Sequence, residues 1–394
     1  MTTSIAIIIL LGLLSKYIFE KLKLPGLLGM LLVGVLLGPY VFNLLDENIL
    51  VISKDLRQLA LIIILLRAGL GISRQNLNKV GKTALFMSFI PGILEGFTIL
   101  LVSTQLFDLT FIEGGILGFI VAAVSPAVVV PSMLTYIDEK RGTKKGIPTL
   151  ILASASVDDV FAITIYTAFL GLYSGTQESI GVQLMNIPIS IILGIVLGIV
   201  IGLALVKFFE IHHIRDTKKV LIILGIATLL TSLESWLFGV IPIASLLGVM
   251  TIGFIILEKR ELVAKRLSVK YNKIWIFAEI LLFILIGSEV NIHVAFEAGL
   301  KGILLIAIGL VARTIGVMLS THGSNLNFKE RLFCAISYIP KATVQAAIGA
   351  VPLSLGIPSG ELILAIAVLS IIITAPLGLI GIRWGSKHLL DQDE

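Results

Sequence analysis

The sequence has little charge, few aromatic side chains and a single cysteine. Of its 394 residues, 14% are charged, 7% are aromatic and 57% are hydrophobic, and the mean hydropathy is +1.05. A soluble domain does not tolerate so apolar a composition, so we predict a membrane protein with several transmembrane segments. Cys334 has no second cysteine to pair with, which excludes a disulfide within the chain.

Long polar connections are also lacking. Thirteen apolar stretches follow one another through links too short for a soluble domain, so any chemistry is expected inside a helix bundle. The first stretch has no basic segment before it and no obvious cleavage site, so we interpret it as a retained helix and not as a signal peptide. The predicted stretches are 4–19, 27–45, 56–72, 83–106, 114–136, 147–173, 184–206, 220–238, 241–257, 274–287, 300–320, 332–351 and 362–382.

Basic residues are nearly absent from every second connection, which predicts the orientation of the chain. Lys and Arg accumulate on the cytoplasmic side of membrane proteins, so the N-terminus is expected outside and the C-terminus in the cytoplasm of a cell-membrane protein. This bias accounts for the net charge of +5 without a nucleic-acid partner. The basic connections and the tail hold Lys21, Lys23, Arg74, Lys79, Lys82, Lys140, Arg141, Lys144, Lys145, Lys207, Arg215, Lys218, Lys219, Lys259, Arg260, Lys265, Arg266, Lys270, Lys273, Lys329, Arg331, Arg383 and Lys387. The others hold Lys54, Arg57 and Lys301.

Two adjacent carboxylates, Asp158 and Asp159, interrupt the apolar stretch 147–173. Asp158 lies eleven residues beyond Ile147, about 16 Å into the membrane at the helical rise, close to the midplane. An aspartate there costs about 2.5 to 3.5 kcal/mol on insertion scales, so the pair predicts an ion or proton site. The small residues before it, including Ser154, allow another backbone to approach closely.

Three further charges and two proline breaks lie at similar depth. Glu95 is central in the fourth stretch, Arg313 in the eleventh, and Lys341 in the twelfth. The fifth stretch contains Ser125 and Pro126, and the twelfth contains Pro340 directly before Lys341. Proline removes a backbone donor and disrupts the preceding helical turn, and freed carbonyls at this depth must meet protein or a water-filled cavity. We therefore predict two discontinuous helices.

The order of these features predicts an internal repeat. A central charge precedes a broken helix in the fourth and fifth stretches and again in the eleventh and twelfth. The offset of seven stretches is odd, so the two units must run through the membrane in opposite directions. The expected fold is an all-α polytopic membrane protein of about thirteen transmembrane helices, with two inverted six-helix repeats whose discontinuous helices cross at the midplane.

Three segments resemble the monovalent cation:proton antiporter superfamily, and most closely the NHA-type sodium/proton antiporters. They are the residues around Ser125 and Pro126, those around Asp158 and Asp159, and the segment that begins at Pro340. The animal-type exchangers have Thr-Asp-Pro where this chain has Val124-Ser125-Pro126, and Asn-Asp where it has Asp158-Asp159. This departure favours the double-aspartate branch.

The resemblance implies a domain plan and roles for individual residues. A scaffold and dimerisation domain would comprise 1–82 and 174–298, and a mobile core domain 83–173 and 299–394, in a homodimer. Asp159 would be the principal cation ligand, and Asp158 would pair with Lys341 or join the ion site. Glu95 and Arg313 would form a salt bridge within the core.

The expected function is exchange of Na⁺ or Li⁺ for H⁺ by alternating access, with no cofactor and no enzymatic reaction. A hard cation takes oxygen ligands, so Asp158 and Asp159, supported by Ser125, Ser154 and the helix breaks at Pro126 and Pro340, would bind it in competition with the proton. A K⁺/H⁺ antiporter and a sodium-coupled solute symporter of the same fold remain alternatives. An intramembrane aspartyl protease is disfavoured, because its two aspartates must reach one bond from separate helices.

Overall fold

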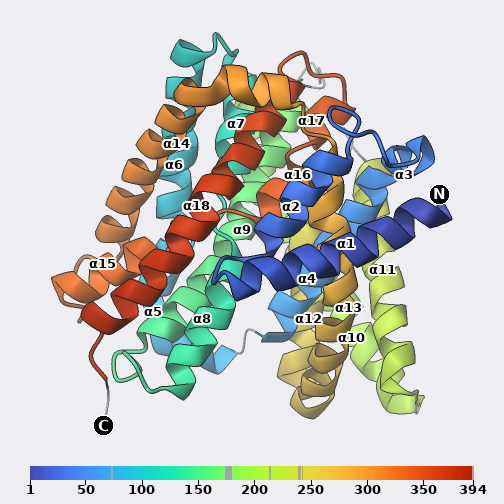
Figure 1. Cartoon of the computed structure of the whole chain (residues 1–394). Helices are drawn as coiled ribbons and strands as arrows, with labels where there is room; N and C mark the ends of the chain where they lie inside the picture. The colour runs from blue at the N-terminus through green and yellow to red at the C-terminus, as the bar shows by residue number, and fades with distance from the viewer. Residues whose placement is uncertain (72–73, 174–179, 213, 238–240, 242, 393–394) are drawn as a thin grey trace. The chain divides into compact units, whose positions relative to one another are not determined.

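The computed structural model describes residues 1–71, 74–173, 180–212, 214–237, 241 and 243–392, and these residues form eighteen α-helices and no β-strand. Within the helices, the side chains of residues 75–80, 126–127, 131, 134, 138, 156, 160, 180–188, 191 and 235 lie outside this description. The helices are α1 (Thr2–Lys21), α2 (Gly26–Leu37), α3 (Glu47–Val51), α4 (Ser53–Gly71), α5 (Arg74–Met87), α6 (Ile90–Leu106), α7 (Phe111–Ala122), α8 (Pro126–Asp138), α9 (Ile147–Tyr173), α10 (Ile180–Ile211), α11 (Asp216–Trp236), α12 (Ser245–Lys259), α13 (Glu261–Ser288), α14 (Ile292–Ser320), α15 (Phe328–Ser337), α16 (Thr343–Ile348), α17 (Val351–Ser354) and α18 (Gly360–His388) (Figure 1).

The predicted all-α fold is confirmed. Each predicted apolar stretch overlaps one helix or consecutive helices separated by a short break, and its ends at 72 and 238 lie outside the described residues. Six helical segments of the described chain are long and apolar enough to cross a membrane: Thr2–Lys21, Gly81–Leu106, Ile147–Tyr173, Ile192–Ile211, Ile292–Ser320 and Gly360–His388. The breaks predicted in the fifth and twelfth stretches separate α7 from α8 and α15 from α16.

Several boundaries differ from the prediction, and two of the differences have a local cause. The stretch 83–106 is divided between α5 and α6, because Pro91 stands in the first turn of α6 and cannot continue a preceding helix. The basic connection expected between α12 and α13 is reduced to Arg260, and Lys265, Arg266, Lys270 and Lys273 lie on α13. Glu261 supports the first turn of this charged helical segment by pairing with Lys265 one turn away, at 2.6 Å.

The chain divides into two compact units. One comprises Met1–Arg57, Lys79–Tyr166 and Ile280–Glu394, and the other comprises Gln58–Asn78 and Thr167–Glu279. In the first unit, α6 packs on α7 and α14, and α18 contacts α7, α8, α14 and α16. In the second unit, α10 packs along α12. The division into scaffold and mobile core stays a prediction.

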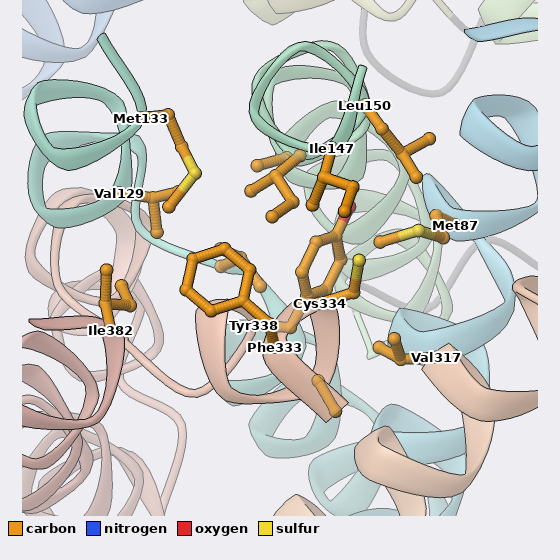
Figure 2. Close-up of a cluster of buried hydrophobic side chains, with 14 of the residues drawn as sticks. Met87, Val129, Met133, Ile147, Leu150, Val317, Phe333, Cys334, Tyr338 and Ile382 are labelled. Atoms are coloured by element: carbon orange, nitrogen blue, oxygen red, sulfur yellow. The ribbon is translucent and has the colours of Figure 1, made fainter. Parts of the chain in front are cut away.

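A cluster of buried apolar side chains holds the helices of the first unit together (Figure 2). Six helices contribute to it: Met87 from α5, Val129 and Met133 from α8, Ile147 and Leu150 from α9, Val317 from α14, Phe333 and Cys334 from α15, and Ile382 from α18. Val124 and Ala155 also belong to it. Val124 directly precedes Ser125, and Ala155 directly follows Ser154. The cluster therefore packs the same backbone segments that carry predicted site residues.

A buried ion pair fixes the first turn of α4 within the same unit. The Arg57 side chain is 1% exposed, and its Nη2 lies 3.1 Å from Glu289 Oε1. The Ser53 hydroxyl donates a 2.6 Å hydrogen bond to the same carboxylate oxygen. Arg57, expected in a polar connection, is thus part of the packed interior.

Glu289→Gln should destabilise the protein more than Arg57→Met. The first variant leaves a guanidinium buried without an acid, whereas the second leaves Glu289, whose side chain is 19% exposed and keeps some contact with solvent. Thermal unfolding of the purified variants, with Glu47→Gln at an exposed glutamate as the control, measures the difference. Equal melting temperatures for the variants at Arg57 and Glu289 would contradict this account of the pair.

Candidate functional site

The two predicted helix breaks touch each other. Residues 123–125 leave the helical conformation between α7 and α8, and Pro126 begins α8 at the position where its missing N–H costs nothing. Residues 338–342 separate α15 from α16. The backbone N–H of Ser125 donates to the carbonyl of Pro340 over 2.8 Å. The predicted crossing of two discontinuous helices is therefore present in the first unit.

Pro340 reaches this position because it packs against a residue without a side chain. A Cβ placed on Gly378 of α18 would overlap the Pro340 ring, so only glycine permits the contact. The N–H of Lys341, the next residue, donates to Thr374 Oγ1 on α18 over 2.8 Å. The break between α15 and α16 is thus tied to α18 as well as to Ser125.

Four buried charged side chains form one network at the crossing. Arg313 Nε on α14 contacts Glu95 Oε2 on α6, and Lys341 Nζ lies 2.6 Å from the same oxygen. Arg313 Nη1 also lies 3.5 Å from Asp158 Oδ1 on α9. None of the four side chains is more than 1% exposed. Two bases therefore face two acids.

The partners of Lys341 and Asp158 differ from the expected pair. Among the ion pairs of the described residues, the Lys341 amino group pairs with Glu95, and the base closest to Asp158 is Arg313. The backbone N–H of Val124 donates to Asp158 Oδ2 over 2.9 Å. On α6, a Cβ at Gly92 would lie 3.1 Å from Asp158 Oδ1, so this side of the carboxylate is closely covered.

Asp159 stands apart from this network. Its side chain is 5% exposed, yet none of the ion pairs found among the described residues includes it. Its Oδ1 has no hydrogen-bond partner in the described part of the chain. The charges of Glu95 and Asp158 are matched by Arg313 and Lys341, whereas the neighbouring carboxylate of Asp159 has no basic partner within the described part of the chain.

Other oxygens near the breaks also have no hydrogen-bond partner among the described residues. Ser125 Oγ at the start of α8 and Thr343 Oγ1 at the start of α16 are buried and have no hydrogen-bond partner among the described residues. The Ser154 hydroxyl instead donates to the carbonyl of Leu150 on its own helix over 2.6 Å. The side chain of Pro126 lies outside the described residues. No group of three or more His, Cys, Asp or Glu side chains suited to a resident metal occurs in the described residues.

Gln345 is a site residue that sequence reasoning missed. Its Nε2 lies 2.9 Å from the carbonyl oxygen of Ile120, 3.2 Å from that of Val121 and 2.9 Å from that of Ala123, all at the end of α7. The available signal was its place four residues after Lys341, just beyond the predicted break at Pro340. A neutral side chain gives no charge to count, so its role was not inferred.

Comparisons with known proteins agree with this architecture. A family profile described as "Sodium/hydrogen exchanger, transmembrane" matches residues 5–384. Sodium/hydrogen exchanger 9B2 of Homo sapiens is 34% identical over 391 residues, which cover 94% of this chain and 71% of the relative. The protein of the same name from Mus musculus is 36% identical over 393 residues, covering 94% of this chain and 69% of the relative.

A solved structure shares the fold. The sodium proton antiporter MjNhaP1 from Methanocaldococcus jannaschii matches with a TM-score of 0.84 at 20% identity, covering 98% of this chain and 97% of that chain. The predicted superfamily is thereby confirmed. The chain is a multi-pass membrane protein that belongs to the sodium/hydrogen exchanger family, whose members are cation:proton antiporters and not enzymes.

Proposed function

We propose that the chain exchanges Na⁺ or Li⁺ for H⁺ by alternating access, with the cation and the proton competing for Asp158 and Asp159. The single observation that carries this proposal is that Asp159 has no basic partner among the described residues, whereas Glu95, Asp158, Arg313 and Lys341 beside it are all paired. The names of the relatives, sodium/hydrogen exchanger 9B2 and sodium proton antiporter, support Na⁺ and H⁺ as the exchanged ions.

The charge balance explains why the two ions would compete. A buried carboxylate without a base is costly when it is ionised. Asp159 can lower that cost by taking a proton or by coordinating a cation, and one carboxylate has no room for both. Its occupancy would then follow the concentrations of the two ions on whichever side the site faces.

The first cation ligands are expected to be oxygens. Asp159 Oδ1, Ser125 Oγ and Thr343 Oγ1 are buried oxygens without hydrogen-bond partners in the described chain. Carboxylate and hydroxyl oxygens suit a hard cation. Asp158 would contribute from its position beside Arg313, or would hold the network in place while Asp159 binds.

Alternating access requires one part of the chain to move against another. We assign the movement to a core of 83–173 and 299–394 against a scaffold of 1–82 and 174–298, which also forms a homodimer. The crossing, the charged network and both aspartates fall within the assigned core. The N-terminus is assigned to the outside of the cell membrane and the C-terminus to the cytoplasm, from the distribution of basic residues.

Purified protein in liposomes tests the proposal. With a preset pH gradient and an internal pH dye, Na⁺ or Li⁺ added outside should dissipate the gradient, and K⁺ should have a smaller effect. Dissipation only by K⁺ would favour a K⁺/H⁺ antiporter. Absence of proton movement with every cation, in protein shown to be folded and inserted, would overturn the proposal in favour of a solute symporter.

Gly92→Ala should slow exchange several-fold without unfolding the protein. The added methyl group would lie 3.1 Å from Asp158 Oδ1, so the carboxylate must shift by a few tenths of an ångström. Gly225→Ala is the matched control, because a Cβ there meets nothing within 4 Å. The maximal exchange rates of the two variants are compared in liposomes. Equal rates would show that Asp158 tolerates displacement.

A further inference from the structure

Two side chains of the second broken helix occupy the carbonyl end of the first. Gln345 Nε2 contacts the carbonyl oxygens of Ile120, Val121 and Ala123 at 2.9, 3.2 and 2.9 Å. Lys341 Nζ lies 3.3 Å from the carbonyl oxygen of Ala122. Four successive carbonyls at the end of α7 are therefore all engaged by side chains.

An unoccupied helix end at this depth would attract cations. The last carbonyls of a helix lack partners within the helix, and together they carry about half a negative charge. In transporters built from broken helices, such carbonyls are suited to coordinate Na⁺. At the end of α7 that capacity is already used, although the hydroxyl oxygens of Ser125 and Thr343 remain without partners among the described residues.

A glutamine at position 345 supplies a neutral hydrogen-bond donor to this helix end. Gln345 is fully buried, and its NH₂ group faces carbonyl oxygens, whereas its Oε1 has no hydrogen-bond partner in the described part of the chain. An amide satisfies carbonyls by donating hydrogen bonds without adding charge. A second cation beside Lys341 would instead oppose the entry of a transported cation, so a neutral donor meets both requirements.

We propose that Gln345 is a positioning residue that determines cation specificity, because it withholds the carbonyls of Ile120, Val121 and Ala123 from the transported ion. The ion is then held by carboxylate and hydroxyl oxygens. This inference rests on the proposed function, since it assumes that a cation binds beside Asp159. When these carbonyls are freed, the site gains neutral carbonyl ligands of the kind that K⁺ filters use.

The test replaces Gln345 by methionine, which has a similar length and no donor. The matched control is Gln105→Met, at an exposed position on α6. Apparent affinities for Na⁺ and for K⁺ are measured for each purified full-length variant from the rise in melting temperature with salt, against choline chloride as the reference. We expect Gln345→Met to change the ratio of the two affinities in favour of K⁺ by roughly tenfold, equivalent to about 1.4 kcal/mol. Gln105→Met should leave the ratio unchanged.

Gln345→Asn serves as the second variant, because it keeps the amide but shortens its reach. If Gln345→Met does not yield folded protein, the affinity ratio of Gln345→Asn should still change in the same direction. An unchanged ratio in the folded variants, even with a lower melting temperature, would overturn the proposal and leave Gln345 a purely structural residue. The measurement reports binding, so wild-type protein that binds Na⁺ without moving protons would refute the exchange proposal separately.

Discussion

Asp159→Asn should abolish cation-driven proton movement while the protein stays folded. The amide keeps the shape of the carboxyl group but neither carries a proton nor balances a cation. Asp159 is buried and takes part in none of the ion pairs of the described residues, so removing its charge leaves no described base unpaired. The pH-gradient assay in liposomes, together with a melting curve, measures both parts of the expectation.

A matched control makes this experiment specific. Asp108→Asn introduces the same change at an exposed aspartate with a positive φ of 55°, a conformation that asparagine also adopts readily. Its exchange should equal that of the wild type. Normal exchange by a folded Asp159→Asn variant would remove Asp159 from the site, whereas loss of folded protein would show that its charge has an unseen partner.

The second large effect is expected from Glu95, which holds two bases. Glu95→Gln leaves both Arg313 and Lys341 without this acid, and breaking a buried pair costs about 3 to 5 kcal/mol of unfolding free energy. Adding Lys341→Gln should restore part of that loss, because Arg313 still has Asp158 at 3.5 Å. Adding Arg313→Gln should restore less of the loss, because Lys341 then has no acidic partner among the described residues.

Melting temperatures rank these variants. The expected order is wild type, then Glu95→Gln with Lys341→Gln, then Glu95→Gln with Arg313→Gln, and last the single Glu95→Gln variant. Glu297→Gln, at an exposed position on α14, should match the wild type. If both double variants melt together with the single variant, the three side chains are not energetically coupled in the way their contacts suggest.

The helical segments and their breaks were predictable because each depends on local chemistry. Apolar length predicts a membrane helix, and Pro126 and Pro340 mark breaks because a proline cannot continue the preceding hydrogen-bond pattern. The division at 88–89 was missed although Pro91 was visible, since a proline within an apolar stretch permits a kink as well as a break. Helix α13 extends beyond its apolar part because charged residues can also form a helix.

The pairing of charges was not predictable from the sequence. Glu95, Asp158, Arg313 and Lys341 were all expected at one depth, but which base meets which acid depends on how α6, α9 and α14 pack. Lys341 has a long, flexible side chain, so a small difference in helix position takes it to Glu95 in place of Asp158. Gln345 was overlooked because its importance comes from three backbone carbonyls, which every residue possesses.

Three backbone donors at the crossing are bonded to other segments, and this limits how it can open. Val124 donates to Asp158, Ser125 to Pro340, and Lys341 to Thr374. Amide protons outside regular helix usually exchange quickly with solvent, yet these three are each bonded to a different segment. Exposing each of them requires the crossing to separate from α9, from the other break or from α18, so these three amides should exchange hydrogen more slowly than other amides outside the helices.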